Sequence, residues 1–281
     1  MTVETTIPDD IVALARSVAA AFAALPQVVA VALAGSRTAL TADAYSDIDL
    51  YVYTSEPIPI EQRIAIMRTF SDAGEIDNAF WEPGDEWIDR QSGIGIDIMY
   101  RTPQWIETQL ERMLLHFEVS LGCSTCLWHN VRTSLALEDR TGWFRDLQSW
   151  ASQLYPLPLR DAILAKNHPV LRQIISSYMR QLESAIRRSD LVGINHRVAA
   201  ILASYFDILF AINLLPHPGG KRLVEQTTAL CANKPPNMSQ HIAAVIQAMA
   251  AAGTEAPTDL IAQLSALLDE LDALLRKERL I

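Results

Sequence analysis

Two carboxylates separated by a single residue, Asp47 and Asp49, are the part of this sequence whose spacing most directly predicts chemistry. Alternate residues of a strand face the same side, so the two acids would lie about 7 Å apart on one face of a strand at residues 47–53. Like charges held this close repel each other, and a divalent cation removes that cost. Mg²⁺ prefers oxygen ligands and keeps some of its water, so the pair predicts a magnesium site that also receives phosphate oxygens.

A third carboxylate, Asp97, falls within the otherwise apolar run at residues 94–100. An acid inside a buried strand is informative, because charged groups are seldom buried without a partner. If this strand neighbours the strand at 47–53, three carboxylates converge. They could then hold two metal ions, one activating the attacking group and one gripping a triphosphate.

Gly35 and Ser36 follow directly after an apolar, valine-rich run at residues 28–34. Glycine lets the backbone approach a phosphate closely, and amides there, with the Ser36 hydroxyl, can receive phosphate oxygens. Arg37 either adds positive charge or faces solvent. Each feature alone is common, since an ordinary turn and a solvated strand end explain them equally. The ordered set of strand, Gly-Ser, Asp-x-Asp strand and later aspartate is what gives the pattern its specificity.

The elements that must position these residues form an α+β part. We expect helices at 8–24 and 61–71, and a turn-rich connection at 84–93. The expected strands of a small mixed sheet are 28–34, 47–53, 75–81 and 94–100.

The character of the chain changes at about Pro103, after which no strand pattern recurs. The expected helices are 105–121, 143–154, 159–165, 171–188, 194–214, 221–232, 241–251 and 259–279. We therefore predict an α+β fold in which a mixed-sheet domain at 1–103 is followed by an all-α domain at 104–281.

The composition of the chain indicates which binding partners and which cellular compartment to expect. The 281 residues include 23 basic and 33 acidic side chains, for a formal net charge of −10. An acidic chain is a poor nucleic-acid binder and suits a cationic small molecule, although such acidity is also common among cytosolic proteins. Three cysteines argue against a disulfide framework and fit a reducing compartment. No signal-peptide pattern is visible and the run at 28–34 is too short to span a bilayer, so we expect a cytoplasmic protein with no membrane partner.

The segments 34–36 (Ala-Gly-Ser) and 46–50 (Ser-Asp-Ile-Asp-Leu) resemble the nucleotidyltransferase core of the DNA polymerase β superfamily. They are closest in style to bacterial antibiotic (aminoglycoside and lincosamide) nucleotidyltransferases, which pair this core with a helical C-terminal domain. The resemblance implies two Mg²⁺ ions, ATP or another nucleoside triphosphate, and transfer of a nucleoside monophosphate to a hydroxyl with release of pyrophosphate.

The same resemblance implies roles for individual residues. Asp47 and Asp49 would ligate the metal, and Asp97 would be a metal ligand, a base, or both. The nucleotide would contact residues of the Gly-Ser motif and the loop that follows it, and one residue of the helical domain. These residues are Gly35, Ser36, Arg37, Ser46 and Lys221.

Two of the site assignments stay open at this point. Asp97 is our first choice for the base that deprotonates the acceptor hydroxyl, and Glu82 is the second, with a surface acid in a turn as its alternative. Lys221 follows Pro218-Gly219-Gly220 and is expected to open a helix. It would either reach the triphosphate across an interdomain cleft or be a solvated helix start.

The acceptor is expected to be a small hydroxyl-bearing molecule, for which a cationic, antibiotic-like compound is the leading example. Alternatives are nucleotidylylation of a protein or RNA, and a non-catalytic regulatory protein of the toxin–antitoxin kind. The retained acids and Gly-Ser argue against the last, because a binding module has no need to hold like charges together. Apolar stripes at 198–215 and 260–275 are compatible with a homodimer.

Cys123, Cys126 and His129 have a metal-like spacing, but the sequence argues against zinc there. A structural zinc ion takes four ligands, and the remaining cysteine, Cys231, is single. We expect Cys123, Cys126 and His129 to share one face of a helix and to pack there as a stripe.

Overall fold

The computed structural model describes residues 9–35, 46–80, 82–251 and 258–281. The chain divides into two compact units, each of which is described by itself. The first comprises Met1–His116 and Leu127–Leu154, and the second comprises Phe117–Cys126 and Tyr155–Ile281.

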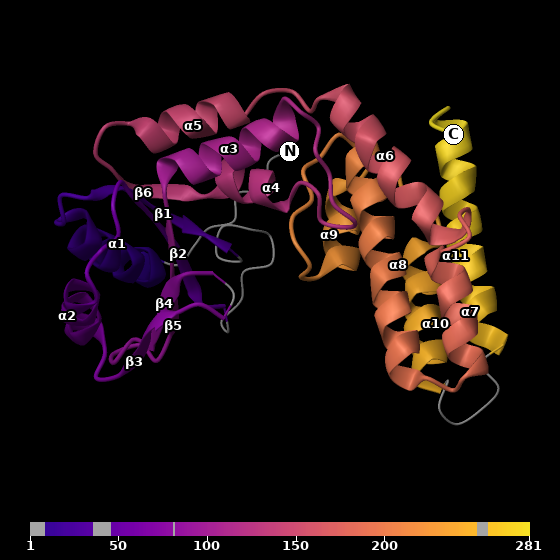
Figure 1. Ribbon diagram of the computed structural model, residues 1–281, viewed down its shortest axis with the longest axis horizontal. Coiled ribbons are helices and arrows are strands. Elements are labelled where there is room, and N and C mark those ends of the chain that lie inside the picture. Colours follow the sequence, from indigo (N-terminus) through magenta and orange to yellow (C-terminus); the bar gives the residue numbers. More distant parts are fainter. Residues whose placement is uncertain (1–8, 36–45, 81, 252–257) are drawn as a thin grey trace. The chain divides into compact units, whose positions relative to one another are not determined.

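A six-stranded sheet with the order β3-β4-β5-β2-β1-β6 forms the centre of the first unit (Figure 1). The pair β2–β5 is parallel and the other neighbours are antiparallel, which confirms the predicted mixed sheet. The strands are β1 (Val28–Ala34), β2 (Ile48–Thr54), β3 (Gly74–Asn78), β4 (Gly84–Ile88), β5 (Gly95–Arg101) and β6 (Leu135–Asp139).

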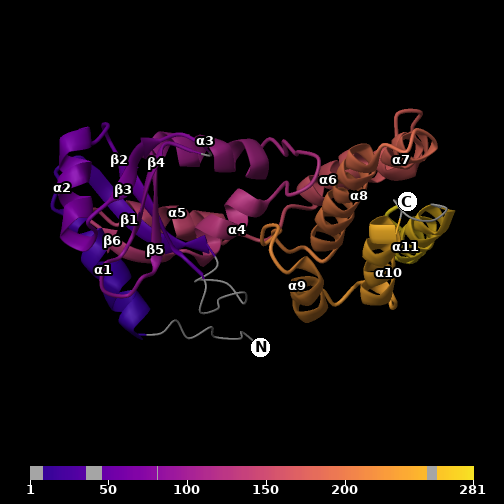
Figure 2. The same cartoon turned by 90° about the horizontal axis from the view of Figure 1, so that it is seen from below.

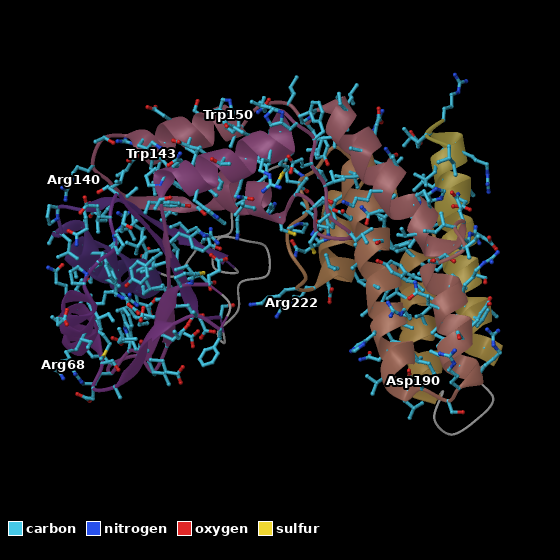
Figure 3. The ribbon with its side chains drawn as sticks, viewed as in Figure 1. Arg68, Arg140, Trp143, Trp150, Asp190 and Arg222 are labelled. Carbon is cyan, nitrogen blue, oxygen red and sulfur yellow. The ribbon has the colours of Figure 1, made fainter. Side chains whose placement is uncertain are left out.

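The two faces of this sheet have different partners. Alternate residues of β2 and β5, such as Ile48 and Ile96, join side chains of α1 and α2 in the hydrophobic core. On the opposite face, the Tyr53 ring packs 5.0 Å from that of Trp143. Figure 3 labels Trp143, which lies at the start of α5. The helices of this unit are α1 (Asp9–Ala23), α2 (Ile60–Phe70), α3 (Pro103–Leu114), α4 (Cys126–Thr133) and α5 (Trp143–Ala151). Because strand side chains alternate, Asp49 and Asp97 lie on the face away from the core.

Two strands were not expected. The segment predicted as a turn-rich connection at 84–93 contains β4, in which the buried Asp85 interrupts the apolar pattern. The second is β6, which follows Pro103 and pairs with β1. This return brings α3, most of α4 and α5 into the first unit, so the boundary expected at residue 103 differs from the division in the structure.

The second unit consists of helices and their connections in the part that the structure describes, as predicted (Figure 2). Its centre is α8, which is buried on all sides from Ser204 to Ile212, as an apolar helix must be. Its helices are α6 (Leu157–Arg172), α7 (Tyr178–Arg187), α8 (Leu191–Ile212), α9 (Leu223–Leu230), α10 (Met238–Ala251) and α11 (Thr258–Lys277). Among the described helices, none combines the length and the apolar character needed to cross a membrane.

The stripe expected from Cys123, Cys126 and His129 does not form. Helix α4 begins only at Cys126, and Cys123 precedes it with a left-handed φ of 50°. The two cysteines therefore lie in a loop and at a helix start, where they are free to meet residues from elsewhere in the chain.

A buried ion pair fixes β4 against α2. Asp85 is fully buried and accepts hydrogen bonds from Arg63 Nε at 2.9 Å, from the Tyr100 hydroxyl at 2.6 Å and from the Asp77 amide at 2.8 Å. Arg63 Nη2 donates to the second Asp85 oxygen. Removing one partner of such a pair leaves an uncompensated buried charge.

We predict that Asp85→Ala lowers the free energy of unfolding by about 3–5 kcal/mol, because Arg63 is left buried without its main partner. Urea unfolding followed by circular dichroism measures the loss. Asp72→Ala is the matched control, since it removes an exposed ion pair with Arg90 and should change stability little. Equal losses in the two variants would contradict the assigned role of Asp85.

Candidate active site

Four carboxylates lie side by side on four neighbouring strands. Strand register places Asp49 of β2 beside Asp97 of β5. It also places Asp97 beside Glu86 of β4, and Glu86 beside Glu75 of β3. Cross-strand partners point to the same side, and strands lie about 4.8 Å apart, so this acidic row (Asp49, Asp97, Glu86 and Glu75) extends over about 15 Å.

The acidic row is electrostatically unfavourable by itself, because like charges directly opposite each other destabilise a sheet. It faces away from the core, since the neighbours Ile48, Ile96 and Trp87 are buried in the core. A row of anions on this face is therefore a surface that gains stability from bound cations.

The carboxylates of Asp47 and Asp49 each lie against a glycine. A Cβ atom on Gly95 would overlap the Asp47 carboxylate, and one on Gly35 would overlap that of Asp49. Gly35 also has a left-handed φ of 67°. Glycine at 35 is thus required by the Asp49 side chain as well as by the turn, and glycine at 95 makes room for Asp47 next to Asp97.

A cavity of about 940 Å³ opens beside these groups, lined by Asp47, Asp97, Glu86 and Glu75 among others. Among the lining residues that the structure describes, carboxylates outnumber the single guanidinium, that of Arg90. Arg90 Nη2 is itself bound to Asp72 at 2.7 Å. The lining therefore carries a net negative charge and favours cationic ligands.

Glu82 has a different place from the one that a base would need. Its carboxylate accepts two hydrogen bonds from the buried Arg101, from Nε at 2.9 Å and from Nη2 at 2.8 Å. The same guanidinium lies 3.9 Å from the centre of the Tyr51 ring. A bidentate pair holds the carboxylate to Arg101, so we do not propose Glu82 as the base.

Tyr51 lies two residues beyond Asp49 and connects the site to the helices. Its hydroxyl accepts a hydrogen bond from Asn130 Nδ2 of α4 at 2.8 Å. Burial raises the pKa of Tyr51, Arg101 opposes that increase, and the Asp49 carboxylate adds to it. Tyr51 is therefore a neutral phenol near neutral pH, which positions neighbouring groups without adding a charge.

The remaining predicted site residues divide between described and undescribed parts of the chain. Ser36 and Arg37 lie outside the described residues. Ser46 is described and is partly exposed just before β2. Lys221 belongs to the second unit and is exposed. It precedes α9, which begins at Leu223, so the expectation that Lys221 opens the helix is wrong by two residues.

Glu86 and Glu75 were missed by reasoning from the sequence. Their signal was weak: alternation of acidic and apolar residues in two five-residue strands, one of which was predicted as a turn. Only the pairing of β3, β4 and β5 shows that both acids continue the line from Asp49 to Asp97.

Comparison with known proteins adds little to this geometry. No protein-family model matches the chain, and no curated protein matches it. Among solved structures, the chain is similar to a nucleotidyltransferase-like protein from Exiguobacterium sibiricum 255-15, at 12% identity and a TM-score of 0.45, covering 95% of this chain and 75% of that one. A similarity at this level carries no argument about function, so the site's own geometry has to supply it.

The glycine beneath Asp49 can be tested by stability. Gly35→Ala should lower the free energy of unfolding by more than the cost of about 1 kcal/mol for a left-handed alanine, because the added Cβ also displaces the Asp49 carboxylate. Gly93→Ala is the matched control, with a φ of 71° and open space around its Cβ. Guanidinium unfolding compares the two, and the tight contact would be refuted by equal losses.

Proposed function

We propose that the protein is a metal-dependent nucleotidyltransferase that transfers a nucleoside monophosphate, with ATP as the first candidate donor, to a hydroxyl of a cationic small molecule. The observation that carries this proposal is the parallel register of β2 and β5, which sets Asp49 beside Asp97, while the Asp47 carboxylate lies against Gly95. The predicted α+β architecture with a helical second part is consistent with it.

The donor set fits Mg²⁺. Asp47, Asp49 and Asp97 supply carboxylate oxygens, which are the ligands that this ion prefers. Gly35 and Gly95 leave space for two of these carboxylates at the edge of the backbone. Bound there, Mg²⁺ would neutralise charge on the phosphates and favour ionisation of the attacking hydroxyl.

The chain's own residues have the remaining tasks. The acceptor oxygen would form a bond to the α-phosphorus as the bond from that phosphorus to the pyrophosphate oxygen breaks. Asp97 would take the hydroxyl proton, because it lies between Asp49 on the metal side and Glu86 on the cavity side. On the nucleotide side, Gly35, Ser36, Arg37, Ser46 and Lys221 remain hypotheses drawn from the sequence.

Glu86 and Glu75 support a cationic acceptor. Both are exposed, both line the cavity, and both continue the acidic row away from Asp97. A molecule with two or more ammonium groups would neutralise the row along its length while presenting a hydroxyl near Asp97. An anionic acceptor would add negative charge to this face, and a purely apolar one would supply no positive charge.

Binding of the nucleotide is the first test. At about 100 times its Kd, ATP with Mg²⁺ should stabilise the wild-type protein by about 2.7 kcal/mol, and Asp49→Asn should remove that gain. Asp72→Asn is the control, because Asp72 lines the same cavity but is paired with Arg90. Differential scanning fluorimetry reports the shift. An unresponsive wild type, or equal shifts in wild type and Asp49→Asn, would sink the proposal.

Catalysis needs a second measurement, namely pyrophosphate release screened over the four nucleoside triphosphates with aminoglycosides, lincosamides and neutral polyols. Release with at least one hydroxyl-bearing acceptor, lost in Asp97→Asn and kept in Asp72→Asn, is the expected pattern. Nucleotide binding without release for any acceptor would leave the transfer reaction unsupported and point to a nucleotide-binding regulatory protein.

We predict that neutralising one member of the acidic row has opposite effects on stability and on acceptor binding. Glu86→Gln should raise the free energy of unfolding by about 0.2–1 kcal/mol at low salt, because it removes the repulsion between Glu86 and its two acidic neighbours. This gain should become smaller at high salt. The same change should raise KM for a cationic acceptor about tenfold, with little effect on kcat or on KM for ATP. A neutral acceptor is the control. Unchanged KM for both acceptors would exclude Glu86 from acceptor recognition.

A further inference from the structure

Two cysteines and a histidine from distant parts of the sequence meet in the second unit. Cys123 and Cys126 belong to the segment 117–126, and His217 belongs to the connection between α8 and α9. One ligand atom from each residue lies within 4.8 Å of the other two. None of the three takes part in the site described above, so this thiol–imidazole cluster (Cys123, Cys126 and His217) is a separate feature.

One distance within the cluster matches tetrahedral coordination. With bonds of about 2.3 Å from Zn²⁺ to sulfur and about 2.0 Å to nitrogen, tetrahedral geometry places sulfur and nitrogen about 3.5 Å apart. Cys126 Sγ lies 3.4 Å from His217 Nδ1. The two atoms are already at the separation that a shared zinc ion would require.

His217 is held so that Nδ1 faces the thiols. The residue is fully buried, its amide donates to Thr125 Oγ1 at 2.7 Å, and its ring packs 4.9 Å from that of Phe210. The Gly219 amide donates to Nδ1 at 3.1 Å, which identifies Nδ1 as the nitrogen with a lone pair. A neutral imidazole whose Nδ1 carries the lone pair, 3.4 Å from Cys126 Sγ, is in the form that binds metal.

The loop that carries the cysteines is fixed from behind. The buried Asp207 of α8 accepts hydrogen bonds from the Ser124 amide at 3.0 Å and from the Ser124 hydroxyl at 2.6 Å. Asn167 Oδ1 accepts from the Gly122 amide at 2.9 Å. These partners hold Cys123 in its left-handed conformation next to Cys126. Such outer contacts are what orients the ligands of a metal site.

The thiolate, rather than the thiol, is the metal ligand, so binding of Zn²⁺ would displace a proton from each thiol that still carries one.

We propose that Cys123, Cys126 and His217 bind one Zn²⁺ ion through two thiolates and Nδ1 of the imidazole. Sulfur and imidazole ligands in tetrahedral arrangement select zinc over the harder cations that suit carboxylates. Among the described residues, the cluster has three members, so the fourth position is taken by water, which can enter because Cys123 is exposed. The ion fastens the 117–126 segment to the connection that follows α8.

The test uses the full-length protein, reduced with a phosphine and kept in excess Mg²⁺ so that carboxylate sites are occupied. We expect one Zn²⁺ per chain by elemental analysis, and competition with a chromophoric chelator to give its Kd. Co²⁺ should replace zinc and show the charge-transfer absorption that only thiolate ligation produces. Zn²⁺ should also raise the melting temperature of the wild type.

Variants separate the cluster from other sites. Cys123→Ser changes an exposed residue, so it should fold while weakening zinc binding by more than about 100-fold and reducing the Co²⁺–thiolate absorption. Cys231→Ser is the matched control, because Cys231 is a buried free cysteine outside the cluster. Asp207→Asn, which alters only the support of the loop, should weaken binding by about 10-fold.

Three outcomes would overturn the proposal. They are a wild type that takes up neither zinc nor thiolate-bound cobalt, unchanged zinc affinity in Cys123→Ser, and a Cys123–Cys126 disulfide that forms even with Zn²⁺ in excess. The proposed nucleotidyl transfer is measured by pyrophosphate release, so either result can fail without the other.

Discussion

The parallel pairing of β2 with β5 is the constraint on which the rest of the first unit depends. It aligns Ile48 with Ile96 toward the core and Asp49 with Asp97 on the opposite face. A shift of one residue would exchange these faces and bury a carboxylate in the hydrophobic core. The hydrophobic core on one face thus specifies the register that assembles the carboxylates on the other. Parallel neighbours also require a crossover, and α2, β3 and β4 lie within it.

That crossover explains how an unfavourable row of charges can persist. The strands β3 and β4 are fixed on their core side by Ile76, Trp87 and the buried ion pair of Asp85 with Arg63. Their other side is therefore free to carry Glu75 and Glu86, whose repulsion is small compared with the packing that holds the strands. Local electrostatic cost concentrated in one cavity, and compensated elsewhere, is typical of functional sites.

Much of the framework could be predicted from the sequence, because its signals are local. Apolar periodicity indicated β1, β2 and β5, and spacing indicated the acids at 47, 49 and 97. The strand β6 escaped prediction because its partner β1 lies far away along the chain, and β4 escaped because the buried Asp85 interrupts its apolar pattern. Asp85 illustrates the difficulty, since a buried acid in a strand makes sense only once Arg63 is next to it.

The same reasoning applies to the residues that were missed. Glu86 and Glu75 become neighbours of Asp97 only through strand pairing, and His217 reaches Cys126 across 91 positions of sequence. Residue spacing in the sequence does not reveal contacts between residues that are far apart along the chain. It does reveal a local pattern such as the Asp-x-Asp pair. The number of cysteines argued against zinc when the sequence alone was considered. That count could not include His217, which comes from the connection between α8 and α9.

The division of the chain into units has a consequence for biosynthesis. The polypeptide passes between the two units three times, after residues 116, 126 and 154. The sheet lacks its edge strand β6 until residues 135–139 have left the ribosome, and by then ten residues of the second unit have already been made. Those residues, 117–126, must wait for α6 and α8 before they acquire their hydrogen-bond partners Asn167 and Asp207. During translation the chain therefore exposes a nascent loop containing two thiols, which is a target for chaperones and oxidants until α6 and α8 have emerged.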